Sequence, residues 1–270
     1  MKRYYPPLLI TGILISAHLS FGILEGYSRT GTAIVVAILA ELVMGRLTYG
    51  QWPNPASAYI TGISVGILVR SPYLWAYALC ALVSIATKYV FRYRNRHIWN
   101  PSNFGVSALL LLAPASASVL SIQWGNVILP MAVIWVLGAV IVWRAGRGHI
   151  SATYVASFLL FSFVQSVVTG KPWLSIVAPI TGPMYQLFVF FMVTDPKTTV
   201  QSKRGQCVVV FLVAVVEMIL RLNEVVYAPF YALFLVGPAA LLVDEWLHAR
   251  GAAGNAAQAG ERSLGWAYRE

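Results

Sequence analysis

Long apolar runs alternate with short polar segments along most of this chain. A helix needs roughly 17–20 apolar residues to cross a bilayer, and we identify ten candidate runs of about this length. The expected spans are residues 6–24, 30–48, 55–70, 72–91, 102–120, 126–143, 150–168, 174–193, 206–222 and 226–246. The pattern predicts an all-α, polytopic membrane protein of about ten transmembrane helices.

Two polar breaks interrupt this pattern, one at residues 97–104 around Asn100-Pro101 and one at residues 191–198 around Asp195-Pro196. Proline lacks an N–H and pushes the preceding residue out of the helical region. Inside a bilayer the freed backbone groups need partners from protein, water or a ligand. Discontinuous helices in matching places of two halves indicate a binding site, so we expect two broken helices that meet near the centre.

Composition supports a single membrane domain. The chain of 270 residues is 59% hydrophobic and 10% charged, whereas a soluble domain carries about 25% charged residues. We expect a transmembrane helical domain at residues 1–250 and a disordered cytoplasmic tail at residues 251–270, where Gly, Ala and polar residues dominate. The run after Lys2-Arg3 lacks a small-residue cleavage site, so it is interpreted as the first span.

The formal net charge of +10 permits a nucleic-acid partner, but its distribution favours topology. With the N-terminus inside, 15 of the 19 Lys and Arg residues fall on inner segments. The outer four are Arg29, Arg70, Lys171 and Arg221. The positive-inside rule then predicts that both termini are cytoplasmic, with anionic lipid heads as the first partner of the basic residues and no nucleic acid.

A weak internal repeat links the two breaks. Residues 57–59, 71–75 and 100–103 have counterparts at 151–154, 170–174 and 195–198, with unequal spacing. The repeat has the same orientation if spans 3–5 match spans 7–9, and it is inverted if spans 1–5 match spans 6–10. Both alternatives remain open. Four small residues are expected to allow close backbone approach near the breaks: Gly62, Gly66, Gly105 and Ala108.

Several polar residues at the breaks have two interpretations. Asp195 either contacts a ligand or cation or caps the segment that follows it. Asn100 and Asn103 either satisfy stranded backbone groups or recognise a carbonyl edge of a ligand. The loop before Asn100 carries a basic cluster of Lys88, Arg92, Arg94 and Arg96. This cluster either anchors the topology or receives a phosphate, a nucleotide or an acidic partner.

Two acids fall within spans, where carboxylates are costly and are functional candidates. Glu217 has Arg221 four residues later, which favours a local ion pair. Glu41 has no such partner, because Arg46 is one residue beyond the favourable spacing, and we hypothesise that Glu41 lines a polar ion pathway. No metal-ligand, nucleophile-elbow or phosphate-loop motif occurs, so the sequence gives no support for hydrolysis or phosphoryl transfer.

At the two breaks the chain resembles a known family. The first motif is Arg94-Asn95-Arg96-His97-Ile98-Trp99-Asn100-Pro101-Ser102, and the second is Phe191-Met192-Val193-Thr194-Asp195-Pro196-Lys197-Thr198-Thr199. Both resemble motifs of NqrB and RnfD, the membrane subunits of the sodium-pumping NADH:quinone oxidoreductase and of the Rnf electron-transport complexes. The similarity covers about residues 50–205, and membrane proteins encoded with enediyne biosynthesis resemble the same family.

The resemblance implies a redox-complex subunit of the bacterial cytoplasmic membrane, with partner subunits that carry other redox centres. It implies that FMN, riboflavin or a quinone binds non-covalently between the breaks. The residues implied for this site are Asn100, Pro101, Asn103, Thr194, Asp195, Thr198 and Arg96. The family's Ser-Gly-Ala-Thr flavinylation motif does not occur, so a covalent flavin is not expected. A small-solute or ion channel or carrier, and a membrane accessory protein of secondary metabolism, remain open alternatives.

Overall fold

A computed structural model of the chain describes residues 11, 12, 14, 15, 18, 26–94, 96–119, 128–195 and 197–267. Most of the expected first span and Pro196 lie outside these residues. The described part is all-α, with ten α-helices and two short pairs of strands. The α-helices are α2 (Tyr27–Tyr49), α3 (Ala56–Leu68), α4 (Leu74–Val90), α5 (Pro101–Leu112), α6 (Ile128–Arg144), α7 (Gly148–Thr169), α8 (Trp173–Val177), α9 (Pro183–Leu187), α10 (Lys203–Leu222) and α11 (Ala228–Ala267).

Helix hydropathy makes this a multi-pass membrane protein. Four of the described helices are long and apolar enough to cross a membrane: α2, α7, α10 and the part of α11 up to Arg250. A fifth candidate is a bent pair of segments, Trp173–Thr181 and Met184–Met192, whose axes differ by 64°. Large apolar side chains such as Leu39, Phe163 and Phe211 are exposed on α2, α7 and α10, as expected for faces that contact lipid.

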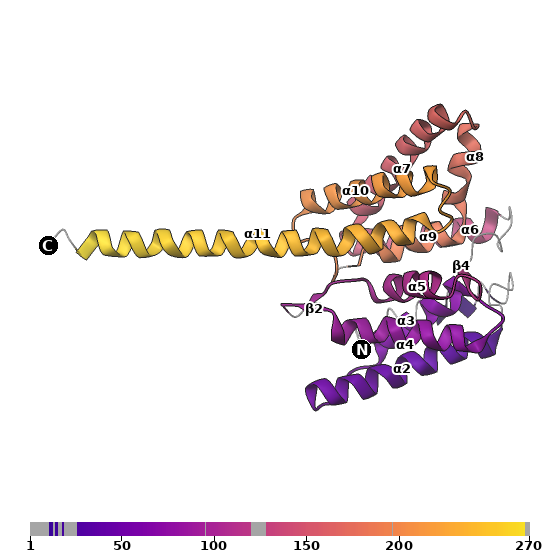
Figure 1. Ribbon diagram of the computed structural model, residues 1–270, viewed down its shortest axis with the longest axis horizontal. Helices are drawn as coiled ribbons and strands as arrows, with labels where there is room; N and C mark the ends of the chain where they lie inside the picture. The colour runs from indigo at the N-terminus through magenta and orange to yellow at the C-terminus, as the bar shows by residue number, and fades with distance from the viewer. Residues whose placement is uncertain are drawn as a thin grey trace.

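The helices form two groups that meet along one seam. Figure 1 shows α2, α3, α4 and α5 in one group, and α7, α10 and α11 in the other. Within the first group, α2 packs against α3 and α4, and α4 packs against α5. Within the second group, α10 packs against both α7 and α11. Contacts between α5 and α11 join the two groups.

Two helices are shorter than the apolar runs that contain them. Helix α3 has 13 residues and α5 has 12, whereas spans of residues 55–70 and 102–120 were expected. Strand β1 (Val69–Arg70) follows α3, and β4 (Ser118–Val119) follows α5. The two strands pair in antiparallel fashion, Val69 with Val119 and Arg70 with Ser118. The chain therefore satisfies backbone groups at the ends of these short helices with a strand pair.

Glycine permits close packing beside both short helices. A Cβ added to Gly62 would lie 2.6 Å from the Ile34 Cα atom, and one added to Gly66 would lie 2.8 Å from the Thr30 Cγ2 atom. On α5, a Cβ added to Gly105 would lie 2.7 Å from the Cys80 carbonyl oxygen of α4. Close approach is therefore found at these three glycines, but on the α2–α3 and α4–α5 interfaces and not where the two breaks meet.

The segment between α7 and α10 is broken rather than continuous. It consists of α8, a 3₁₀-helix η2 (Ala178–Thr181), α9 and a π-helix η3 (Phe188–Met192). The bend lies at Gly182, and Pro183 opens α9. At the other end of the chain, α11 continues as a helix to Ala267, through residues for which the composition predicts disorder. The boundary at residue 250 stays a prediction.

Candidate functional site

The first break lies between α4 and α5 and is organised around Asn100. Strands β2 (Arg92–Tyr93) and β3 (Arg96–His97) form a small hairpin before it. Asn100 is the N-cap of α5: its Oδ1 accepts the backbone N–H of Asn103 at 3.0 Å, and Pro101 occupies the first turn. Both features favour a helix start at this point. The Asn100 side chain thus satisfies a backbone group at the break, which was one of the two roles considered for it.

The second break follows the π-helix η3. A π turn leaves carbonyls without their usual helical donors, and such turns are frequent at functional sites. Here the Ser151 hydroxyl of α7 donates to the Val189 carbonyl at 2.9 Å, and the Thr194 hydroxyl donates to the Phe190 carbonyl at 2.6 Å. Arg147 donates to the Thr194 carbonyl at 3.3 Å. Side chains of the protein therefore satisfy this irregular backbone.

Asp195 joins the two breaks. Its Oδ2 atom accepts from the Asn100 amide at 3.1 Å and from the Thr198 hydroxyl at 3.2 Å. Its Oδ1 atom accepts the backbone N–H of Lys197 at 3.1 Å. Asp195 also fixes its own loop, because the Thr199 hydroxyl donates to its carbonyl. The two motifs, 95 residues apart in sequence, are thus connected by one hydrogen bond between side chains.

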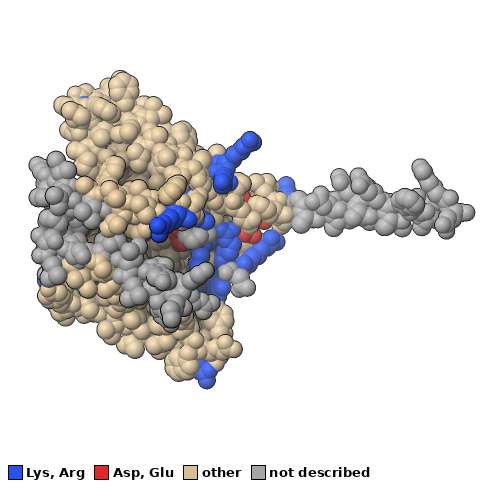
Figure 2. Space-filling model, turned by 180° about the vertical axis from the view of Figure 1, so that it is seen from behind, with Lys and Arg blue, Asp and Glu red and all other residues tan. Residues whose placement is uncertain are grey.

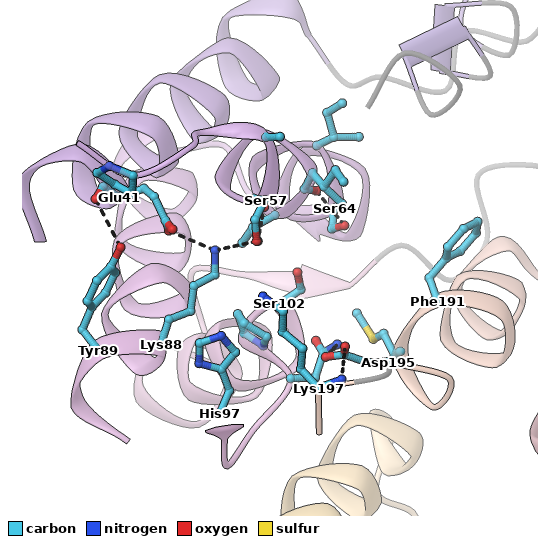
Figure 3. A pocket seen from close by; sticks show the side chains of 18 of the residues that line it. Glu41, Ser57, Ser64, Lys88, Tyr89, His97, Ser102, Phe191, Asp195 and Lys197 are labelled. Atoms are coloured by element: carbon cyan, nitrogen blue, oxygen red, sulfur yellow. Dashed lines mark hydrogen bonds and ion pairs between the residues drawn. The ribbon is translucent and has the colours of Figure 1, made fainter. Parts of the chain in front are cut away.

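A cavity of about 960 Å³ lies beside this connection, between the first group of helices and the second break. Its walls come from α2, α3, α4, the first break and the second break (Figure 3). The polar and charged side chains that line it are Glu41, Asn54, Ser57, Thr61, Ser64, Lys88, Arg92, His97, Asn100, Ser102, Asp195 and Lys197. The apolar part of the lining includes Ile60, Ile63, Ile67, Leu68, Leu187, Phe191 and Met192. Apolar walls with a few convergent polar groups are typical of small-molecule sites.

A buried ion pair forms one wall of the cavity. The Lys88 ammonium lies 3.0 Å from the Glu41 Oε2 atom and donates to the Ser57 hydroxyl at 3.1 Å (Figure 3). The two residues are only 5% and 8% exposed. Glu41 therefore has a partner that lies 47 residues away, and Lys88 belongs to the last turn of α4 instead of the loop cluster in which we placed it. Removing either partner would leave an uncompensated buried charge.

His97 lies at the cavity rim. Its Nδ1 atom is buried and has no hydrogen-bond partner among the described residues. Burial, followed by the positive charges of Lys197, Lys88 and Arg92, lowers the pKa of His97 to about 4, against the opposite effect of a hydrogen bond to the Lys88 backbone. His97 is therefore neutral at physiological pH, beside three cationic side chains.

Arg96 holds the second break from outside the cavity. It lies 3.1 Å from the Glu245 carboxylate of α11 and also donates to the Thr199 carbonyl. Arg94 lies 3.7 Å from the same carboxylate. These two members of the predicted basic cluster are thus paired with an acid of α11.

The first break is also tied to α11 by backbone carbonyls. Pro238 lies inside α11 and has no N–H to offer the Phe234 carbonyl four residues earlier. The Trp99 indole N–H donates to that carbonyl at 2.9 Å. One turn earlier, the Asn103 amide donates to the Phe230 carbonyl at 3.2 Å. Asn103 therefore points toward α11 and away from the cavity.

Glu217 belongs to a separate buried cluster. Its carboxylate accepts hydrogen bonds from the Tyr154 hydroxyl of α7 and, at 2.6 Å, from the Tyr185 hydroxyl of α9. Arg221 does not form the local ion pair that its spacing favours. It donates instead to the Ile176 carbonyl of α8 and lies over the Phe158 ring, 4.8 Å from its centroid.

The predicted site residues therefore fall into two sets. Asn100, Pro101, Asp195 and Glu41 line the cavity. The others support its surroundings or lie elsewhere, as their contacts above show: Asn103, Thr194, Thr198, Arg96 and Glu217. Sequence reasoning did not assign Ser57 or Lys197 to the site. Ser57 lies in the weak repeat and Lys197 in the second motif, but neither pattern marks a site residue, because only the fold brings α3 and the second break to one cavity.

No group of three or more His, Cys, Asp or Glu side chains in the described part of the chain is arranged to hold a metal ion. No protein-family model matches the chain, and no curated protein matches it in sequence. The assignment of a function therefore depends on the cavity and its lining.

Proposed function

We propose that this chain is a membrane subunit of an electron-transport system similar to those containing NqrB and RnfD, and that its cavity binds a flavin or quinone non-covalently. The observation that carries the proposal is the cavity of about 960 Å³, which is lined by residues of both the first and the second break. Ligand pockets commonly measure about 300–1,000 Å³, so this cavity is large enough for a flavin or quinone ring.

The lining suits such a ring. Phe191, Met192 and Ile63 offer apolar surface for a planar aromatic group. The Asp195 carboxylate accepts hydrogen bonds only, which suits an N–H of a flavin, and the Ser102 hydroxyl offers a donor for a ring carbonyl. When bound, the ring supplies the one- and two-electron chemistry, while the protein supplies position and polarity. With two cysteines in the chain, iron–sulfur centres would have to come from partner subunits.

The proposed membrane arrangement has about ten spans with both termini in the cytoplasm, as in a bacterial cytoplasmic membrane protein. Figure 2 shows Lys and Arg side chains gathered around the place where α11 leaves the bundle. The positive-inside rule assigns this end to the cytoplasm. Three exposed lining residues lie at the same end: Tyr49 at the end of α2, and Asn54 and Lys197 in loops. The cavity would therefore open to the cytoplasm.

Helix packing supports the inverted form of the repeat. If α2 to α5 correspond to α7 to α11, the packed pairs α2–α4 and α4–α5 correspond to α7–α10 and α10–α11. The short helix α3 then corresponds to the bent segment from α8 to η3. The same-orientation alternative would match α3 with α7, although α3 has 13 residues and α7 has 22.

A small-solute or ion carrier is the second candidate. The buried Glu41–Lys88 pair in the cavity wall favours it, because ionisable residues within membrane segments commonly mark transport pathways. In such a carrier a transported ion replaces one partner of the pair, and this step requires no redox cofactor.

An absorbance spectrum of the detergent-purified full chain tests the proposal, recorded before and after denaturation and after incubation with FMN, riboflavin or ubiquinone. A flavin spectrum that enters the soluble fraction on denaturation, or saturable binding of any of the three probes, supports it. No binding of any probe to folded protein would overturn it. Solute uptake by proteoliposomes of the chain alone would then support the carrier.

A further inference from the structure

Glu217 differs from the other buried acids in having no cationic partner. Three acids of the described residues are buried: Glu41, Glu217 and Glu245. The other two form salt bridges, one with a cation of α4 and one with two cations of the first break. Glu217 forms none with a Lys or Arg of the described part, although at 1% exposed it is the most deeply buried of the three. Neutral groups alone therefore hold its carboxylate.

The neutral groups are two buried tyrosine hydroxyls. Tyr154 of α7 donates to the Glu217 Oε2 atom, and Tyr185 of α9 donates to the Oε1 atom at 2.6 Å. One further titratable group of the described residues acts on the carboxylate, Arg221 one turn along α10, and its guanidinium donates to the Ile176 carbonyl. Helix α11 packs on α10 but adds no described titratable group to this cluster. Elements of three different helices thus meet at one carboxyl group.

Buried polar atoms continue from this cluster along α7. Phe158, Ser162 and Gln165 follow Tyr154 on one face of the helix, because they are spaced by three or four residues. Ser162 and Gln165 are only 1% and 8% exposed, yet the Ser162 Oγ and Gln165 Oε1 atoms have no hydrogen-bond partner among the described residues. Internal water molecules commonly satisfy buried polar atoms of this kind.

This polar face leads to the end of α7. Gln165 lies four residues before Thr169, the last residue of the helix, which is about 6 Å at the helical rise. Thr169 is exposed, and α8 packs beside this part of the bundle (Figure 1). Water that enters beside the α7–α8 turn would therefore reach Gln165 first, then Ser162, and then the carboxyl group.

A proton on Glu217 would change the hydrogen bonds of the cluster. The ionised carboxylate accepts from both tyrosines, whereas a protonated carboxyl group has one O–H donor of its own. One of the two tyrosine hydrogen bonds must then reverse or break. Tyr185 belongs to α9, which continues through η3 into the second break, so the bent segment contains the partner that responds.

We propose that Glu217 is a proton-binding site within the membrane, reached through Gln165 and Ser162 from the α7–α8 turn, and that its proton controls how the bent segment packs on α10. The proton comes from water at that end and returns there on release, so no bond other than an O–H bond forms or breaks. The site consists of residues of α7, α9 and α10 and requires no ligand in the cavity. Failure of flavin and quinone to bind would therefore overturn the proposed function and leave the proton site standing.

Infrared difference spectra of the full-length protein in nanodiscs test the proton site, with the pH stepped between about 9 and about 4. The carbonyl stretch of a protonated carboxylic acid should include a component that is lost in Glu217→Gln. Glu224→Gln, at an exposed acid that follows α10, is the matched control and should keep this component. Absence of any component specific to Glu217 in folded protein would overturn the proton site.

Hydrogen–deuterium exchange of the same component tests the route. Ser162→Ala combined with Gln165→Leu should slow this exchange at least about tenfold, a factor that corresponds to the loss of about one hydrogen bond. Ser166→Ala, at a hydroxyl that bonds to the exposed turn at Lys171, is the control and should leave the rate unchanged. An unchanged rate in the double variant would contradict access along α7.

Distances between spin labels at Leu174 and Val208 test control of the bent segment. The distribution should differ between the two ends of the pH range in the wild type and should not differ in Glu217→Gln. Identical wild-type distributions would contradict this part of the proposal. If Glu217→Gln does not fold, Tyr185→Phe replaces it, because it removes one donor and should move the pH midpoint of the infrared component by about one unit or more. An unmoved midpoint would overturn the role of Tyr185.

Discussion

At the scale of single residues, polar side chains beside the breaks take the places of missing backbone partners. Asn100 caps α5, Ser151 satisfies a carbonyl of the π-helix, and Trp99 satisfies a carbonyl freed by Pro238. Asn and Asp beside proline predict a helix boundary, so the position of Asn100 followed from the sequence. The roles of Ser151 and Trp99 did not, because their partners lie 38 and 135 residues away.

His97 should make stability depend on pH. Its pKa is about 4 in the folded protein and 6.5 for an ordinary histidine, so between these values the unfolded chain binds a proton that the folded protein does not. Stability from this group is full above about pH 6.5 and is lost as the pH falls toward 4. The thermal unfolding midpoint of the wild type, relative to that of His97→Gln, should therefore decrease between about pH 7 and pH 4.5. A difference independent of pH would contradict a neutral His97.

Trp99 and Pro238 should be energetically coupled. Trp99→Phe keeps the aromatic packing but leaves the Phe234 carbonyl without a donor, so the free energy of unfolding should fall by about 1–2 kcal/mol. In a Pro238→Ala background the helix supplies its own N–H, and the same substitution should cost clearly less. Denaturant titrations of the four variants measure this double-mutant cycle. Additive effects would show that the indole hydrogen bond does not replace the missing helical one.

At the scale of elements, α10 holds both arms of the bent segment. The two arms lie on opposite sides of the bend at Gly182. Glu217 accepts from Tyr185, which follows the bend, and Arg221 donates to the Ile176 carbonyl, which precedes it. The spacing of Glu217 and Arg221 by four residues predicted a pair with each other. In the fold each of the two side chains instead bonds to a different arm, because a buried polar group without a hydrogen bond costs free energy.

Glu217→Leu should therefore weaken the bent segment. It leaves the Tyr154 and Tyr185 hydroxyls unpaired, at a cost of about 1–3 kcal/mol for each group. We expect a lower thermal unfolding midpoint and a broader distribution of distances between spin labels at Leu174 and Val208. Glu217→Gln keeps an acceptor and should retain most of the stability.

The exposed acid Glu224 provides the control for this substitution. Glu224→Gln should change neither the unfolding midpoint nor the distance distribution. An unchanged distribution in Glu217→Leu would mean that the bend does not depend on α10.

At the scale of the whole molecule, hydropathy predicted the fold class and failed on helix length. Apolar runs at residues 55–70 and 102–120 looked continuous, yet α3 and α5 end at Leu68 and Leu112. Hydropathy does not distinguish a helix from the short strand pair that follows these helices. The sequence also did not predict the partner of Glu41, since Lys88 lies beside a basic loop and its burial depends on how α4 packs on α2.

The distribution of basic residues leads to a topology that chemical labelling can test. Single cysteines at Arg204 and Leu174 are placed in a Cys80→Ala, Cys207→Ser background. A membrane-impermeant maleimide should label position 204 only in inside-out vesicles and position 174 only in intact cells, because the positive-inside rule places α10's first turn in the cytoplasm. The reverse pattern would invert the proposed orientation.

The hydrogen bonds between the first break and α11 also determine when the first break can be completed during synthesis of the chain. Glu41 and Lys88 are 47 residues apart, so the early helices carry both members of their charge pair as they leave the ribosome. The donors Asn103, Trp99 and Arg96 find their partners in α11 only after a further 127 to 149 residues have been synthesised. Helix α11 is thus made after the first break that it fixes. A nascent chain arrested before Ala228 would insert its charge pair but lack the acceptors that fix the first break.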